Sequence, residues 1–86
     1  MEGLYKIEKV TDLEGKLKED YLTDNNKKAH YKIDWAGDGD VVYLWNYNNE
    51  IYHSGMRTSY ADSVVKKGNE VVVTTMNSVY RLVSVY

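Results

Sequence analysis

The sequence predicts a single, mainly β domain covering residues 1–86, folded as a small antiparallel barrel or a strongly bent sheet of the SH3-like or OB-like kind. The first supporting observation is length, because 86 residues suffice for one small domain with its own core. From residue 30 onward, runs rich in β-branched and aromatic residues recur at the ~8–12-residue spacing typical of all-β folds. Finally, no proline interrupts these runs.

The C-terminal stretch 69–86 predicts the clearest hairpin, around which the other strands are arranged. Runs of valine, threonine and tyrosine flank Asn77-Ser78, which is a suitable pair for a two-residue turn. With that turn, Thr74 faces Arg81 across the hairpin. Because both faces carry apolar side chains, we expect this hairpin to be buried on both sides.

The N-terminal third is less regular. Residues 3–10 alternate between apolar and polar side chains and predict a first strand. Residues 12–22 fit two interpretations: a strand or turn-rich segment, which the β-rich remainder favours, and a short helix with its leucines and a tyrosine on one face. Residues 23–28 contain only polar side chains and predict a loop.

The next segment is a strand followed by a turn. Residues 30–35 alternate strictly, which places Tyr31, Ile33 and Trp35 on one face. Residues 36–40 combine glycine with aspartate and predict the turn that ends this strand.

Residues 41–47 and 50–54 predict a second hairpin in the middle of the chain. Asn48-Asn49 forms its turn, because asparagine tolerates the positive φ that hairpin turns require. This turn places Tyr47 opposite Glu50. One face of the hairpin is then aliphatic and the other is aromatic.

A polar stretch at residues 55–63 predicts a connection to a further strand at 64–67. The following Gly68-Asn69 turn places Lys67 opposite Glu70, a favourable cross-strand charge pair. Residues 62–86 therefore predict a three-stranded meander.

Charge and composition exclude several functional classes. Lys and Arg number 11 and Asp and Glu number 13, which gives a formal net charge of −2. This balance lacks the basic stripe of a general nucleic-acid binder. The absence of cysteine excludes disulfides and thiolate metal sites. Since no stretch resembles a signal peptide or has membrane length, we expect a cytoplasmic protein that does not associate with membranes.

Catalytic and metal-binding signatures are also missing. No Gly-x-Ser-x-Gly motif occurs, and His30 and His53 lack the spacing of metal ligands. Gly37-Asp38-Gly39 is too acidic to cradle a phosphate, and it predicts a turn. We therefore expect a protein that is not an enzyme and that uses no metal and no cofactor.

The aromatic content points to binding. The chain has nine Tyr and two Trp but no Phe, and tyrosine suits positions that need an apolar body and a polar tip. Unless the aromatic face of the middle hairpin forms the barrel core, we expect it to contact a partner or ligand. A second, polar set includes Arg81, which lies within the apolar C-terminal hairpin. We expect its guanidinium to pair with a carboxylate such as Asp62 or Glu70, or else to bind an anionic ligand. The candidate residues are Tyr43, Trp45, Tyr47 and Tyr52 on the aromatic face and Arg57, Thr58, Ser59, Tyr60, Asn77 and Arg81 in the second set.

Part of the second set also carries a resemblance. Arg57-Thr58-Ser59, the strands at 64–68 and 71–75, and a closing Thr-x-Asn-Ser-x-Tyr-x-Leu at residues 75–82 resemble the C-terminal pattern of small phage-encoded β proteins of the host-defence-inhibitor kind. The resemblance covers none of residues 1–50. It implies an accessory protein that acts in a bacterial host by binding a host protein or complex. Some proteins of this kind instead sequester a nucleotide signal.

Three binding functions follow. The preferred hypothesis is a non-enzymatic inhibitor that binds a host protein. The second is a small-ligand binder, in which a base stacks on Tyr43, Trp45 or Tyr52 while Arg57 or Arg81 meets phosphate. The third is a weak nucleic-acid-binding module of the OB or SH3-like type, which the charge balance disfavours. Open sheet edges and the tyrosine-rich face also predict a homodimer.

Overall fold

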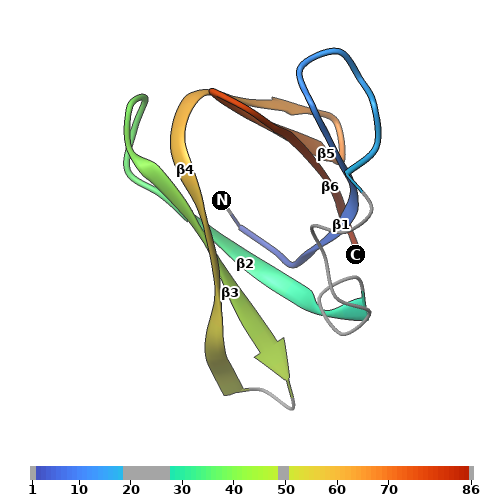
Figure 1. Ribbon diagram of the computed structural model, residues 1–86. Helices are drawn as coiled ribbons and strands as arrows, with labels where there is room; N and C mark the ends of the chain where they lie inside the picture. The colour runs from blue at the N-terminus through green and yellow to red at the C-terminus, as the bar shows by residue number, and fades with distance from the viewer. Residues whose placement is uncertain (1, 19–27, 49–50, 86) are drawn as a thin grey trace.

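The computed structural model describes residues 2–18, 28–48 and 51–85, with the backbone alone at residues 48 and 51–54. Each strand pairs antiparallel with its neighbour in sequence, and the last strand pairs with the first, so the sheet closes into a barrel (Figure 1). The predicted small antiparallel barrel is confirmed, although its up-and-down order differs from the five-stranded Greek key of the OB type. The described strands are β1 (Tyr5–Thr11), β2 (His30–Trp35), β3 (Val41–Asn48), β4 (Ile51–Lys67), β5 (Glu70–Thr75) and β6 (Val79–Ser84).

Alternation along the strands fills the barrel interior. Side chains that point inward come from all six strands and form one buried cluster. A barrel of so few strands has room inside for side chains only, so we expect binding on its outer surface or at its ends. The buried cluster consists of Tyr5, Ile7, Val10, Tyr31, Ile33, Val42, Leu44, Ala61, Val71, Val73, Tyr80 and Leu82.

The predicted strands in the first half of the chain are confirmed. β1 and β2 bury the alternating residues that the sequence indicated, and Trp35 at the end of β2 is half-buried against the core. The turn at 36–40 is also confirmed, and the Gly39 amide donates to the Ala61 carbonyl oxygen at 2.9 Å. This bond fastens the turn to β4.

The segment after β1 is a turn, as the favoured interpretation predicted, and residues 12–18 are not helical. Asp12 Oδ1 accepts hydrogen bonds from the amides of Lys16 and Glu14, each at 2.9 Å. The Lys16 amide, and to a smaller degree that of Glu14, holds the pKa of the Asp12 carboxyl below its usual value. The chain then returns to form a bridge between Leu17 and Thr11. Residues 19–22 of the alternative helix and the predicted loop up to residue 27 lie outside the described residues.

The C-terminal hairpin forms with a register two residues away from the predicted one. Arg81 lies opposite Val72, and Thr74 lies opposite Val79. The reason is that the turn lies one residue earlier: Thr75 and Ser78 close it around Met76 and Asn77. The Thr75 amide donates to the Ser78 carbonyl oxygen at 2.8 Å, and Thr75 Oγ1 accepts from the Ser78 amide at 3.2 Å. A shift of two residues in the pairing leaves each side chain on the face predicted for it.

The expectation that this hairpin is buried on both sides is wrong. The inward positions of β5 and β6 are buried, but the outward positions are only half-buried. The outer wall of a closed barrel faces solvent unless another layer covers it.

The middle hairpin is also displaced. β3 ends at Asn48, paired with Ile51, so Tyr47 lies opposite Tyr52 and not Glu50. The connecting residues 49 and 50 lie outside the described residues. The pairing of Lys67 with Glu70, by contrast, is confirmed, and with it the C-terminal meander.

The largest difference from the prediction lies in β4. In place of two short strands separated by a polar connection at 55–63, the structure has one strand of 17 residues. Its register shifts at two places against β3 and at one place against β5. Such bulges bend and twist a strand, and β4 curves over the top of the barrel from β3 to β5 (Figure 1). The polar side chains that suggested a connection belong largely to its outward face.

Candidate functional site

The outer face of β3 carries a pair of exposed aromatic rings. Val42 and Leu44 point into the core, so Tyr43 and Trp45 point outward. Their rings stack with centroids 5.6 Å apart and an angle of 15° between planes. Each residue remains 38% exposed. The alternative that these rings form the barrel core is therefore wrong for both.

A bulge in β4 lies directly beside Trp45. Met56 pairs with Leu44 and His53 pairs with Asn46, so residues 54 and 55 together oppose Trp45. A Cβ atom at Gly55 would collide with the Leu44 carbonyl oxygen, and it would lie 2.8 Å from the Leu44 carbonyl carbon and 3.0 Å from the Asn46 nitrogen. Only glycine fits where the two backbones approach so closely.

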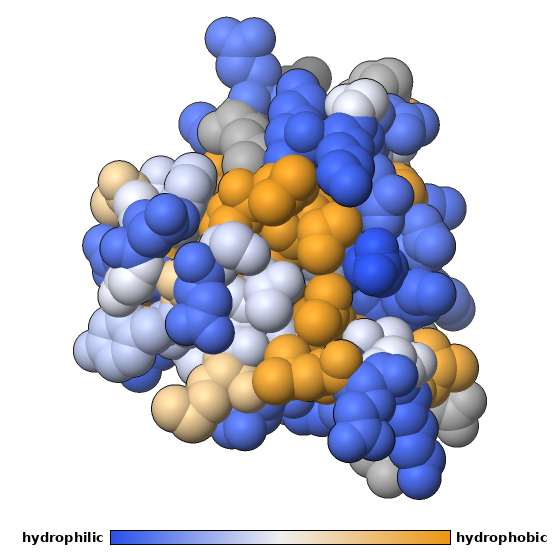
Figure 2. Space-filling model, turned by 90° about the horizontal axis from the view of Figure 1, so that it is seen from above, coloured by the Kyte–Doolittle hydropathy of each residue, from blue (hydrophilic) through white to orange (hydrophobic). Residues whose placement is uncertain are grey.

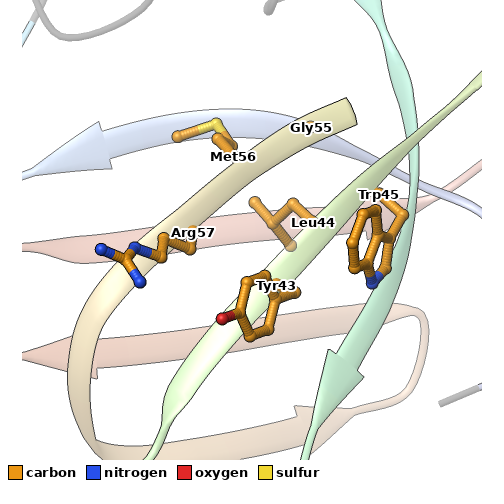
Figure 3. A pocket seen from close by; sticks show the side chains of 6 residues that line it. All are labelled: Tyr43, Leu44, Trp45, Gly55, Met56 and Arg57. Atoms are coloured by element: carbon orange, nitrogen blue, oxygen red, sulfur yellow. The ribbon is translucent and has the colours of Figure 1, made fainter. Parts of the chain in front are cut away.

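A shallow cavity lies next to the two rings, and the bulge at Gly55 forms part of its lining. Its volume is about 230 Å³. Figure 3 shows the residues around it: the rings of Tyr43 and Trp45 lie on the outer face, whereas Leu44 points into the core and Met56 packs against that core. We call this site the β3–β4 groove, and it is lined by Tyr43, Leu44, Trp45, Gly55, Met56 and Arg57.

The groove has an apolar end and a charged end. Arg57 lies directly opposite Tyr43, whereas the bulge places Gly55 beside Trp45. The Arg57 residue is exposed, and within the described part of the chain its guanidinium makes no ion pair or hydrogen bond. Because arginine stays protonated, the groove presents one fixed positive charge at the Tyr43 end.

The remaining residues of the aromatic face are less informative. Tyr47 is half-buried, and the side chain of Tyr52 lies outside the described residues. Of the aromatic face predicted from the sequence, the structure therefore places Tyr43 and Trp45 in the groove.

Several residues of the second predicted set have structural roles. Thr58 is buried, and its Oγ1 accepts from the Val42 amide at 3.2 Å and donates to the Ser59 carbonyl oxygen at 2.7 Å. These bonds stabilise the second bulge between β3 and β4. Ser59 and Tyr60 follow on β4 and are exposed, but neither lines the groove.

Arg81 and Asn77 also lie away from the groove. Arg81 Nη1 pairs with Glu70 Oε1 at 3.3 Å on the outer wall, which confirms the carboxylate alternative for this arginine. The Arg81 side chain is 39% exposed and the Glu70 side chain is 33% exposed. Solvent therefore screens the pair, which contributes at most about 1 kcal/mol to stability. Asn77 is exposed in the β5–β6 turn. The structure brings neither residue to Arg57.

The sequence motif behind the phage-protein resemblance has a structural explanation. Thr58 fastens a bulge, while Thr75 and Ser78 close the β5–β6 turn through their mutual hydrogen bonds. Tyr80 and Leu82 belong to the buried cluster. The motif therefore describes how the barrel folds, and its residues are not those of the groove apart from Arg57.

Sequence reasoning missed Gly55, Met56 and the wall formed by Leu44. A signal was present, since glycine inside a strand often marks a bulge or a close backbone approach. The residues around Gly55 are mostly polar, so the segment was interpreted as a connection and its glycine was not recognised as a bulge within a strand.

Two other surfaces are weaker candidates. A wider cavity of about 460 Å³ near the β4–β5 turn is lined by polar groups and by charges of both signs, including Glu2 and Lys66. Seen from above, an apolar band crosses the molecule between hydrophilic side chains (Figure 2). Exposed Leu17 and Met76 also present apolar side chains on the loops. The charged group near them, the Lys18 ammonium, donates a hydrogen bond to Ser78 Oγ at 2.8 Å, so it is already engaged within the chain. Neither surface combines rings, a cavity and an available charge as the groove does.

Among the described residues, no group of three or more His, Cys, Asp or Glu is placed to hold a metal ion. No helix in the described ranges has the length and apolar character needed to cross a membrane. Comparison of the chain with protein-family models, with curated proteins and with solved structures gives no match.

Proposed function

We propose that this protein is a non-enzymatic binding protein that holds a partner protein through the β3–β4 groove. The observation that carries the proposal is the stacked Tyr43–Trp45 pair, of which each residue is 38% exposed beside a cavity. Aromatic and arginine side chains around a pocket are the residues that most often dominate binding energy at protein interfaces. Exposure of two large rings without such a role costs solubility and stability.

The size of the cavity favours a protein partner over a complete small ligand. About 230 Å³ lies below the ~300–1,000 Å³ of most small-molecule pockets. Such a cavity accommodates one anchoring side chain from a larger surface. Among the described residues, the polar groups at the groove are a tyrosine hydroxyl, an indole N–H, a guanidinium and backbone, which suit binding better than acid–base or nucleophilic chemistry.

We extend the proposal to the setting implied by the C-terminal resemblance. The protein would then be an accessory protein of a phage or mobile element, acting in the cytoplasm of its host by occupying a surface of a host protein. The structure explains the resemblance motif as folding chemistry, so this extension is tested separately from the groove itself.

Retention of a partner from bacterial host lysate tests the function. The wild type and Tyr60→Ala, which removes an exposed tyrosine outside the groove, are expected to retain the same protein. Trp45→Ala is expected to weaken retention about 30-fold or more, the effect of a hot-spot residue of at least ~2 kcal/mol. Equal loss in both variants, or no retained protein at any salt concentration, contradicts the proposal.

Two further measurements separate the other binding hypotheses. A nucleotide panel that includes cyclic dinucleotides is expected to leave the melting temperature unchanged. A rise that disappears in Arg57→Gln would instead favour the nucleotide-binding function. The molecular mass in solution decides whether the partner of the groove is a second copy of this chain.

A further inference from the structure

The layout of the β3–β4 groove restricts the chemistry of its partner, and this inference rests on the proposed function. We propose that the groove recognises an extended acidic peptide segment with an apolar residue and a carboxylate two positions apart. The apolar side chain enters the cavity beside Trp45, and the carboxylate pairs with Arg57. The partner class is thus a protein that exposes such a segment.

The first argument is spacing along β4. Gly55, in the bulge, marks the apolar end and Arg57 the charged end, and Met56, paired with Leu44, stands between them. Residues two apart in a strand point to the same face about 6.5–7 Å apart. An extended peptide lying along the groove has the same repeat, so its matching side chains are also two residues apart.

The second argument is charge. Arg57 is the sole charged residue in the groove lining, and within the described residues its guanidinium has no carboxylate partner. One positive charge matches one carboxylate. A nucleotide phosphate group or a polynucleotide brings more negative charge than the single arginine in the lining balances.

The third argument is the character of the cavity beside the rings. The stacked rings of Tyr43 and Trp45 present mainly carbon to the cavity. An aliphatic or aromatic side chain gains from burial there, whereas a polar one would lose its hydration without a fixed partner.

The test uses three blocked tripeptides as probes. N-acetyl-Leu-Ser-Asp-amide has the proposed spacing, N-acetyl-Leu-Ser-Asn-amide lacks the charge, and N-acetyl-Leu-Asp-Ser-amide has the charge one residue too early. Each is titrated into isotope-labelled full-length protein while NMR follows the Trp45 indole N–H and the Gly55 amide. The Leu-Ser-Asp peptide is expected to bind about 2–5-fold more tightly than either control at low salt, the range of an exposed ion pair.

Arg57→Gln provides the matched control variant. It should reduce the affinity for the Leu-Ser-Asp peptide to that of the Leu-Ser-Asn peptide and leave the latter unchanged. Added salt should remove the same difference in the wild type. A change in both affinities would show that Arg57 acts through the fold, which overturns its role as the carboxylate partner.

The outcomes separate this inference from the proposed function. Equal binding of all three peptides, with the Trp45 signal shifting, overturns the acidic segment but leaves the groove as a binding site. No shift with any peptide also overturns the inference, while partner retention from lysate still decides the function. Adenosine monophosphate that shifts the same signals in an Arg57-dependent way, when the peptides do not, assigns the groove to a nucleotide.

Discussion

Replacing Gly55 with alanine is expected to destabilise the barrel and to deform the groove at the same time. The added methyl carbon would lie 2.8 Å and 3.0 Å from the Leu44 carbonyl carbon and the Asn46 nitrogen, well inside ordinary contact distance. Both are backbone atoms, so no side-chain rotation relieves the collision. β3 and β4 must separate locally or the bulge must rearrange.

The expected cost follows from comparing two effects. Overpacking of this kind typically costs about 1–3 kcal/mol and occasionally more. Alanine also lowers the conformational entropy of the unfolded chain, which stabilises the folded state by only about 0.4–1 kcal/mol. Because the collision is with backbone, we take the upper half of the overpacking range, which leaves a net loss of about 1–2.6 kcal/mol. A domain of 86 residues is stable by about 4–13 kcal/mol, so this loss is a substantial fraction. The corresponding fall in melting temperature is about 5–20 °C.

Urea unfolding followed by tryptophan fluorescence and by circular dichroism measures this loss. Ser59→Ala is the matched control, because Ser59 is exposed on the same strand and its replacement should change stability by less than about 0.5 kcal/mol. If Gly55→Ala is as stable as the wild type, the two strands do not approach as described, and the bulge does not require glycine.

Three further predictions concern aromatic side chains. A double-mutant cycle of Tyr43→Ala and Trp45→Ala should give a coupling of about 0.5–1.5 kcal/mol in unfolding free energy, and additive losses would contradict the observed stack. Burial raises the pKa of Tyr31 above its usual 10.0, so its contribution to stability is complete below the unfolded-state pKa and is lost as the pH rises through the folded-state value. Tyr31→Phe should therefore flatten the decline in stability above pH 10, and an unchanged slope would refute this assignment. Trp35 Nε1 is buried with no hydrogen-bond partner among the described residues, so Trp35→Phe should cost less than about 1.5 kcal/mol, whereas Trp35→Ala should cost about 3 kcal/mol or more.

The strands and their inward faces could be predicted because alternation is a local property. Tyr31 and Ile33 alternate with polar neighbours, and both are buried in the barrel. Even where the turns were misplaced, as at Asn77-Ser78, the register error was two residues. An even shift keeps each side chain on its own face, although only one of the two faces is buried.

The position of this turn could not be predicted from the turn residues alone. Asn77-Ser78 is an acceptable two-residue turn by composition, but Thr75 and Ser78 close a turn around Met76 and Asn77 with side-chain and backbone hydrogen bonds. The Arg81 pairing changed as a result, from Thr74 to Val72. Local propensity does not reveal which of two hydrogen-bonded closures fits the curvature of the barrel.

The continuity of β4 was hidden for a different reason. Each bulge inserts an extra residue and reverses the phase of the alternation, so inward and outward positions no longer follow a period of two along the whole strand. Thr58 is buried although it is polar, and Tyr60 is exposed although it is aromatic. Together with Gly55, these residues look like a loop in sequence and form a bent strand in the structure.

Closure of the barrel and formation of the groove share one cause. A filled interior leaves only outer surfaces for binding, and β4 must bend to complete the ring. The bulge that contributes to this bend requires Gly55, and the same bulge lines the cavity beside Trp45. It follows that Gly55 is constrained by the fold and Met56 by its packing against the core, whereas exposed Arg57 is free to vary with the partner. Diversity among related chains should therefore concentrate at position 57 while the glycine is retained, and the opposite pattern would argue that the groove serves the fold alone.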